Sequence, residues 1–139
     1  MTTVSSTLCF MGALLFLLGL LIGFGIPSFR NPRIGLSAHL TAIESGLALI
    51  AFGLLIPHLT IAARWAGAVG LALWLSLYVL CAGLLFAAVY GTGRVFPIAG
   101  GDMAAKAWQE KTARVLISIG SLGSVGAIIV LLAKWQWRA

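Results

Sequence analysis

The hydrophobic residues of this chain fall into four long runs separated by short polar segments. The runs cover about residues 8–26, 36–59, 65–90 and 115–133. A helix needs roughly 20 residues to cross the hydrocarbon core of a bilayer, and each run is long enough. The pattern predicts an all-α integral membrane protein, a bundle of four transmembrane helices in a single domain over residues 1–139 without a soluble domain.

The composition supports this assignment. Hydrophobic residues make up 61% of the chain and charged residues only 9%, and the mean hydropathy is +1.09. Soluble domains do not reach these values. Although the net charge is +6, no basic stretch is interleaved with stacking aromatic residues, so nucleic acid is not an expected partner. Cys9 and Cys81 lie inside predicted helices without metal-ligand spacing, and we expect inert apolar thiols.

The cations are distributed unequally between the two sides of the predicted bundle. One side carries Arg30, Arg33, Arg94, Lys106, Lys111 and Arg114. The other side carries Arg64, Lys134 and Arg138. Because cytoplasmic loops of membrane proteins are enriched in Lys and Arg, we expect both long loops to be cytoplasmic, in a bacterial inner membrane whose lipids are direct partners of the chain.

The head of the second run, GLSAHLTAIESG, contains a histidine and a glutamate. At 100° per residue, His39 shares a helix face with Ala42 and Gly46. An imidazole at this depth can bond to a neighbouring helix, accept a proton or ligate a metal. The small residues on its face would also make room for a planar macrocycle standing on an axial histidine, or simply for tight helix packing.

Three arginines are expected near His39, where they could pair with the propionates of a haem. They are Arg30, Arg33 and Arg94. His58 lies 19 residues further along the same helix, which is roughly 28 Å. One chain therefore cannot bring both histidines to one iron, and a haem held by His39 alone would keep an open position for a substrate.

Two further polar residues inside the apolar runs are candidates for chemistry. Glu44 is the only carboxyl within a predicted run, and it points about 140° away from His39. It could pair with a basic group, line a cavity or face a neighbouring subunit. Tyr78 lies in the middle of the third helix, where its hydroxyl could donate to a substrate oxygen or serve packing. No motif of hydrolytic chemistry is present.

Three segments of the chain resemble the hydroxylaminobenzene mutase family and, more distantly, styrene oxide isomerase. They are LLGLLIGFGIPSFRNPRIGLSAHL, the following helix that ends in IPHL, and YGTGRVFPIAGGD. The most specific parts are Asn31 to Leu40 and Pro97 to Gly101. The resemblance covers essentially the whole chain and implies a homotrimer with haem b between neighbouring subunits, its iron ligated by His39. Ser45 stands where the family often has a substrate-orienting asparagine.

The resemblance also implies a redox-neutral isomerase in which ferric haem acts as a Lewis acid. The expected reaction converts a small arylhydroxylamine, taken from the lipid phase, to a 2-aminophenol by intramolecular hydroxyl transfer, as in nitroaromatic degradation. The alternatives are the isomerisation of an aryl epoxide to an aldehyde, a haem membrane protein without enzymatic activity, and a structural membrane subunit. The candidate catalytic residues are Tyr78, Ser45 and Glu44. The candidate cofactor-binding residues are His39, Ala42, Gly46, Arg30, Arg33 and Arg94.

Overall fold

The computed structural model describes residues 2–135, and every regular element in this range is helical. Four helices are long and apolar enough to cross a membrane, which confirms the predicted all-helical class with four candidate spans. These helices are α1 (Thr3–Gly25), α2 (Pro32–Leu55), α3 (Ala63–Tyr90) and α5 (Ala107–Ala133). Three short helices lie between them: η1 (Ile26–Ser28), η2 (Ile56–His58) and α4 (Pro97–Gly100).

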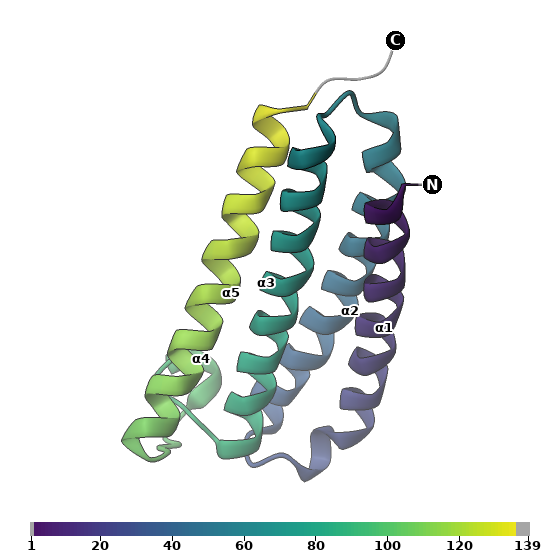
Figure 1. The fold of residues 1–139 in the computed structure, drawn as a ribbon. Coiled ribbons are helices and arrows are strands. Elements are labelled where there is room, and N and C mark those ends of the chain that lie inside the picture. The colour runs from purple at the N-terminus through teal and green to yellow at the C-terminus, as the bar shows by residue number, and fades with distance from the viewer. Residues whose placement is uncertain (1, 136–139) are drawn as a thin grey trace.

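The long helices run up and down in sequence order (Figure 1). α1 packs mainly against α2, α3 packs mainly against α5, and the contact between α2 and α3 joins the two pairs. η1 and α4 lie at one end of the bundle, whereas η2 and both ends of the described chain lie at the other (Figure 1). The two cation-bearing connections predicted to share a side are therefore at the same end of the molecule. Arg138 lies outside the described residues.

Helix α2 begins four residues earlier than the hydrophobic run predicted. The side-chain oxygen of Asn31 accepts hydrogen bonds from the backbone N–H groups of Arg33 (3.1 Å) and Ile34 (3.2 Å). Pro32 follows at the first helical position, where a missing N–H costs nothing. At the other end Pro57 cannot donate a backbone hydrogen bond, and the α-helix gives way to η2.

Helix α5 begins at Ala107, although its apolar run was predicted to start at residue 115. The first two turns are polar, so hydropathy assigned them to a loop. Their helical start is fixed by Gln109, whose side-chain oxygen accepts the N–H of Lys106 at 2.9 Å. Similarly α1 begins at Thr3, because the Thr2 hydroxyl accepts the N–H of Ser5 at 3.3 Å. Polar helix ends at the headgroup level are invisible to a hydrophobicity pattern.

Glycines bring the backbones of α1 and α2 into direct contact. A Cβ atom added to Gly46 would lie 2.7 Å from the carbonyl oxygen of Gly12 and 2.7 Å from the amide nitrogen of Phe16. Ala42, on the same face of α2, is completely buried. The small residues of this face thus make room for α1 in the single chain, the simpler of the two interpretations that the sequence allowed.

Replacing Gly46 with alanine is expected to lower the melting temperature of the detergent-purified protein. The new methyl group meets backbone atoms of α1, which cannot rotate away, so the two helices must separate at a cost of about 2 kcal/mol. Gly126→Ala is the matched control, because a Cβ atom there has no neighbour within 4 Å. Alanine is also the better helix former. Equal melting temperatures for the two variants would contradict the close approach.

Candidate functional site

The imidazole of His39 is fixed by helix α1. Its Nδ1 atom lies 2.7 Å from the carbonyl oxygen of Gly19, and the half-buried ring lies against Gly23, where a Cβ atom would come within 2.8 Å of it. A carbonyl oxygen can only accept, so Nδ1 carries the proton. In the neutral ring Nε2 is then the nitrogen with a free lone pair. Metal-bound histidines commonly have this arrangement.

The other predicted cofactor residues differ in their surroundings. Ala42 and Gly46 face α1, as described above. The three arginines, Arg30, Arg33 and Arg94, are exposed at the end of the bundle that carries α4. His58 is exposed at the opposite end, in η2. Within residues 2–135 no group of three His, Cys, Asp or Glu side chains could hold a metal ion, so an iron at His39 would need ligands from a cofactor.

An apolar groove of about 540 Å³ lies between α1 and α3. Among its lining side chains only Tyr78 and Cys81 carry a polar hydrogen. The Tyr78 hydroxyl donates a 2.8 Å hydrogen bond to the carbonyl oxygen of Met11 in α1. The full lining is Leu15, Leu18, Leu21, Ile22, Gly25, Phe29, Tyr78, Cys81, Ala82, Leu85 and Val89.

Of the three predicted catalytic residues, only Tyr78 lines this groove, and Ser45 contacts another lining residue, Cys81. Ser45 is buried behind it on α2, and its hydroxyl is hydrogen-bonded to the thiol of Cys81. Cys81, for which we expected an inert thiol, therefore has a polar neighbour in Ser45. Glu44 is not part of this group. It is exposed on the outer side of α2, without a hydrogen-bond or ion-pair partner within the described range.

His39 and the groove lie on different sides of α1. The imidazole contacts Gly19 and Gly23, which face α2. The groove is lined by Leu18 and Ile22, on the other flank of the helix. A single chain therefore does not present His39 and Tyr78 to one common cavity.

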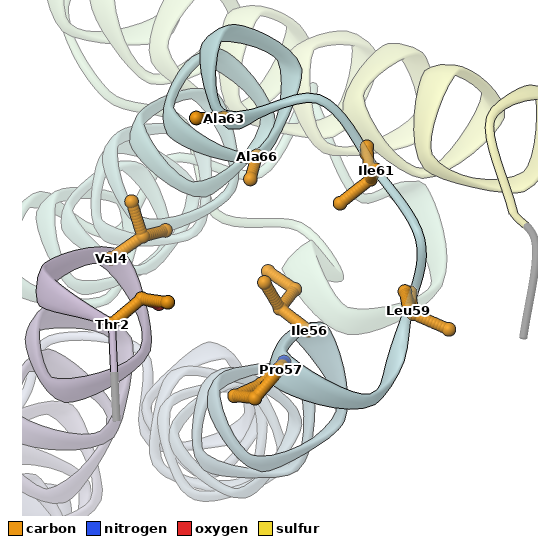
Figure 2. Close-up of a pocket in the computed structure, with 8 residues that line it drawn as sticks. All are labelled: Thr2, Val4, Ile56, Pro57, Leu59, Ile61, Ala63 and Ala66. Atoms are coloured by element: carbon orange, nitrogen blue, oxygen red, sulfur yellow. The ribbon is translucent and has the colours of Figure 1, made fainter. Parts of the chain in front are cut away.

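A second cavity, of about 460 Å³, opens at the end of the bundle where the described chain begins and ends. Figure 2 shows its lining, which comes from the start of α1, from η2 and its following segment, and from the start of α3. Thr2 provides the only hydroxyl, and the lining contains no acid, base or thiol. This cavity has no groups for acid–base or ligand chemistry, so the α1–α3 groove is the better candidate.

A buried carboxylate that was not among the predicted site residues stabilises the connections at the α4 end of the bundle. Glu110 is only 4% exposed. Its side chain accepts hydrogen bonds from the backbone N–H groups of Gly93 (3.0 Å), Arg94 (3.2 Å) and Ala105 (3.3 Å). The residue falls in the polar segment that was assigned to a loop, so nothing in the hydropathy pattern marked it.

The two most specific sequence motifs contact each other at the same end. The side-chain amide of Asn31 donates a 3.1 Å hydrogen bond to the carbonyl oxygen of Ala99 in α4. Its backbone N–H donates to the carbonyl oxygen of Ala88 in α3 at 3.0 Å. A Cβ atom added to Gly100 would collide with the backbone of Gly93, and one added to Gly93 would collide with the carbonyl oxygen of Met103. The NPR and PIAGG segments are therefore two halves of one structural unit that joins α2, α3 and α4.

Comparisons with known proteins agree with this picture. The sequence matches the family described as styrene oxide isomerase over residues 4–135. It is 39% identical to hydroxylaminobenzene mutase HabB of Ectopseudomonas oleovorans over 132 residues, 93% of this chain and 78% of that protein. It is 36% identical to HabA of the same organism over 110 residues, 76% of this chain and 79% of that protein. The chain belongs to the styrene oxide isomerase family and is an isomerase.

Proposed function

We propose that this protein converts an arylhydroxylamine to a 2-aminophenol by intramolecular hydroxyl transfer within the membrane. The observation that carries the proposal is the apolar α1–α3 groove, in which a small aromatic molecule from the lipid phase would meet the phenol of Tyr78. The names of the two relatives point to the same substrate class.

The hydrogen bonding of Tyr78 favours this substrate over an epoxide. The Tyr78 hydroxyl donates its proton to the Met11 carbonyl. The phenol oxygen can therefore accept a hydrogen bond from a bound molecule but cannot donate one to it. An arylhydroxylamine carries N–H and O–H groups that can donate to such an oxygen. An aryl epoxide has only an acceptor oxygen, which would find no partner there.

We propose haem b as the cofactor, with His39 as the residue that would bind its iron. The donor chemistry fits, since the Gly19 carbonyl fixes the tautomer that leaves Nε2 free for a metal. The arginines at the α4 end, Arg30, Arg33 and Arg94, are the candidates for binding its propionates. Ala42 and Gly46 are occupied with α1 and have no part in this proposal. When bound, ferric haem supplies a Lewis acid for the substrate oxygen.

The active assembly in this proposal is a homotrimer with a haem at each subunit interface. His39 and the Tyr78 groove lie on different flanks of α1, so they can serve one substrate only if they come from different copies. The apolar groove walls then exclude water during N–O bond cleavage. Water would otherwise add to the ring at the para position and divert the product from the 2-aminophenol.

The isomerisation of an aryl epoxide to an aldehyde is the second candidate, favoured by the description of the matching family. An anaerobic assay with hydroxylaminobenzene and styrene oxide, each with the detergent-purified protein, separates the two. We expect 2-aminophenol in H₂¹⁸O without ¹⁸O incorporation, because the hydroxyl never leaves the site. Turnover of styrene oxide alone would replace the first proposal by the second, and ¹⁸O in the product would exclude intramolecular transfer.

Replacing Tyr78 with phenylalanine is expected to lower kcat/KM for the arylhydroxylamine about tenfold, the effect of one lost hydrogen bond of about 1.4 kcal/mol. Glu44→Gln is the control, because Glu44 faces away from the groove, and it should stay within about twofold of wild type. If Tyr78 only holds α1 to α3, the variant would lower the melting temperature and leave kcat/KM unchanged.

We place both cation-rich connections in the cytoplasm of a bacterial inner membrane, on the basis of the charge distribution. Single cysteines at Asp102, in the connection between α4 and α5, and at Thr60, after η2, offer exposed positions at the two ends. A membrane-impermeant maleimide applied to intact cells should label Thr60→Cys and spare Asp102→Cys. The reverse pattern would invert the proposed orientation.

A further inference from the structure

An apolar groove of about 250 Å³ runs between α3 and α5, which lie side by side (Figure 1). From Trp65 to Ala72 it is about 10 Å long, so it covers part of one leaflet of a bilayer whose hydrocarbon core is about 30 Å thick. None of its residues lines the two cavities described above. The lining of this α3–α5 groove is Trp65, Ala68, Val69, Ala72, Gly123, Gly126, Ala127 and Val130.

Gly126 leaves a space in this groove that the chain itself does not fill. Glycine weakens the interior of a helix relative to alanine, and in membrane helices close packing commonly explains its presence. At Gly120 and Gly123 of the same helix, an added Cβ atom would collide with α3. At Gly126, by contrast, a Cβ atom would have no neighbour within 4 Å. Packing within the chain therefore explains the first two glycines and not the third.

Two cations stand beside Trp65, at the end of the groove. The Arg64 guanidinium lies 5.9 Å from the centroid of the Trp65 ring, and the Lys134 ammonium lies 5.5 Å from it. Both residues are exposed, and neither has an ion-pair partner within residues 2–135. Of the three acids in the sequence, two are at the opposite end of the bundle and one is in the middle of α2. The acidic side chains of the chain thus supply no counter-charge for these two cations.

We propose that the α3–α5 groove binds an acyl chain of an anionic phospholipid, whose phosphate contacts Arg64 and Lys134. Basic pockets between transmembrane helices are typical sites for anionic headgroups, and tryptophan is typical of the same depth in the membrane. A flexible acyl chain can follow a groove of small residues and fill the space beside Gly126. This lipid site does not rest on the proposed isomerase reaction.

A second copy of the chain fits this groove less well than a phospholipid does. Copies with the same membrane orientation are related by an axis along the membrane normal, which keeps each residue at one depth. A neighbour would bring its own Arg64 and Lys134 to the same level without an acidic side chain, and like charges repel. A phosphate at the headgroup level supplies the missing negative charge.

Lipid titration of the detergent-purified full chain tests the charged part of the site. Native mass spectrometry counts the molecules of phosphatidylglycerol, or of phosphatidylcholine with the same acyl chains, that bind per chain. We expect one phosphatidylglycerol per chain, bound at least about tenfold more tightly than phosphatidylcholine. Each cation at a charged lipid surface is worth about fivefold in affinity, so the double variant Arg64→Gln/Lys134→Gln should weaken phosphatidylglycerol binding about 30-fold.

The matched control for charge is Lys111→Gln/Arg114→Gln, which removes the same two charges from exposed positions at the opposite end of α5. It should leave the affinity for phosphatidylglycerol within about twofold of wild type. Equal weakening by the two double variants would show a general attraction to net positive charge and would overturn the proposal.

Leucine substitutions that fill the groove test its apolar part. Ala68→Leu and Gly126→Leu change exposed lining positions to a good helix former. Each should weaken the binding of both lipids at least about tenfold, because several methylene groups of the acyl chain lose their buried surface. Gly67→Leu is the control, since Gly67 lies beside Ala68, has no neighbour within 4 Å of an added Cβ atom and is outside the groove.

Two outcomes of the leucine series would overturn the lipid site. Equal loss of lipid in Gly67→Leu and Gly126→Leu would mean that the groove is not where the lipid binds. Loss of subunit association in Gly126→Leu, with the bound lipid retained, would make a second copy of the chain the occupant of the groove.

Discussion

Replacing His39 with alanine is expected to remove the Soret absorption of the detergent-purified protein and to lower the isomerase rate more than about 100-fold. Losing even a partner of a metal ligand commonly costs 10-fold to 100-fold in metal affinity, and in the proposed site this variant would lose the ligand itself. The measurement is the absorption spectrum of protein expressed with ample haem, beside the rate of 2-aminophenol formation.

The control for this variant is His58→Ala, which removes the same side chain from an exposed position at the other end of the bundle. It should keep both the spectrum and the rate. A wild type without a Soret band, or a His39→Ala protein with an unchanged one, would exclude His39 as the axial ligand. The Gly19 carbonyl would then only fasten α2 to α1.

Replacing Glu110 with alanine is expected to destabilise the protein by about 3 kcal/mol or more. The change leaves the N–H groups of Gly93, Arg94 and Ala105 without their acceptor, and a buried unsatisfied N–H costs about 1–3 kcal/mol. The melting temperature of the detergent-purified protein, followed by tryptophan fluorescence, should fall by about 10 °C.

Two other variants make the Glu110 result specific. Glu110→Gln retains one acceptor oxygen and should show a smaller loss of melting temperature than Glu110→Ala. Asp102→Ala removes an exposed carboxyl from the same loop region and should have little effect. If Asp102→Ala and Glu110→Ala lowered the melting temperature equally, the loss of stability would come from the change in net charge at this end and not from the three hydrogen bonds.

The position of Glu110 has a consequence for the groove. Asn31 and Glu110 fix the connections that join α2, α3, α4 and α5 at the end where Phe29 and Val89 close the groove. A membrane-embedded site needs a fixed spacing between its helices. Apolar contacts between helices do not fix this spacing by themselves, because lipid tails make equally favourable contacts with the same surfaces. Directed hydrogen bonds at the headgroup level fix the helix ends instead.

The sequence by itself determined the four spans, because hydrocarbon requires long runs of apolar residues and such runs are visible in a hydropathy pattern. It also singled out His39 and Tyr78, since polar groups are rare and conspicuous in these runs. The family resemblance, carried by the segments around Asn31 and Ala99, was confirmed by the comparisons.

The tertiary structure decided what the small and polar residues do. Helical periodicity placed Ala42 and Gly46 beneath His39, but it could not say that α1 fills that space. Hydropathy counted Glu110 as part of a loop, whereas its carboxylate is the acceptor for three backbone N–H groups. The physical reason is that a sequence pattern gives the direction of a side chain on its own helix, while the neighbour in that direction depends on how the helices pack.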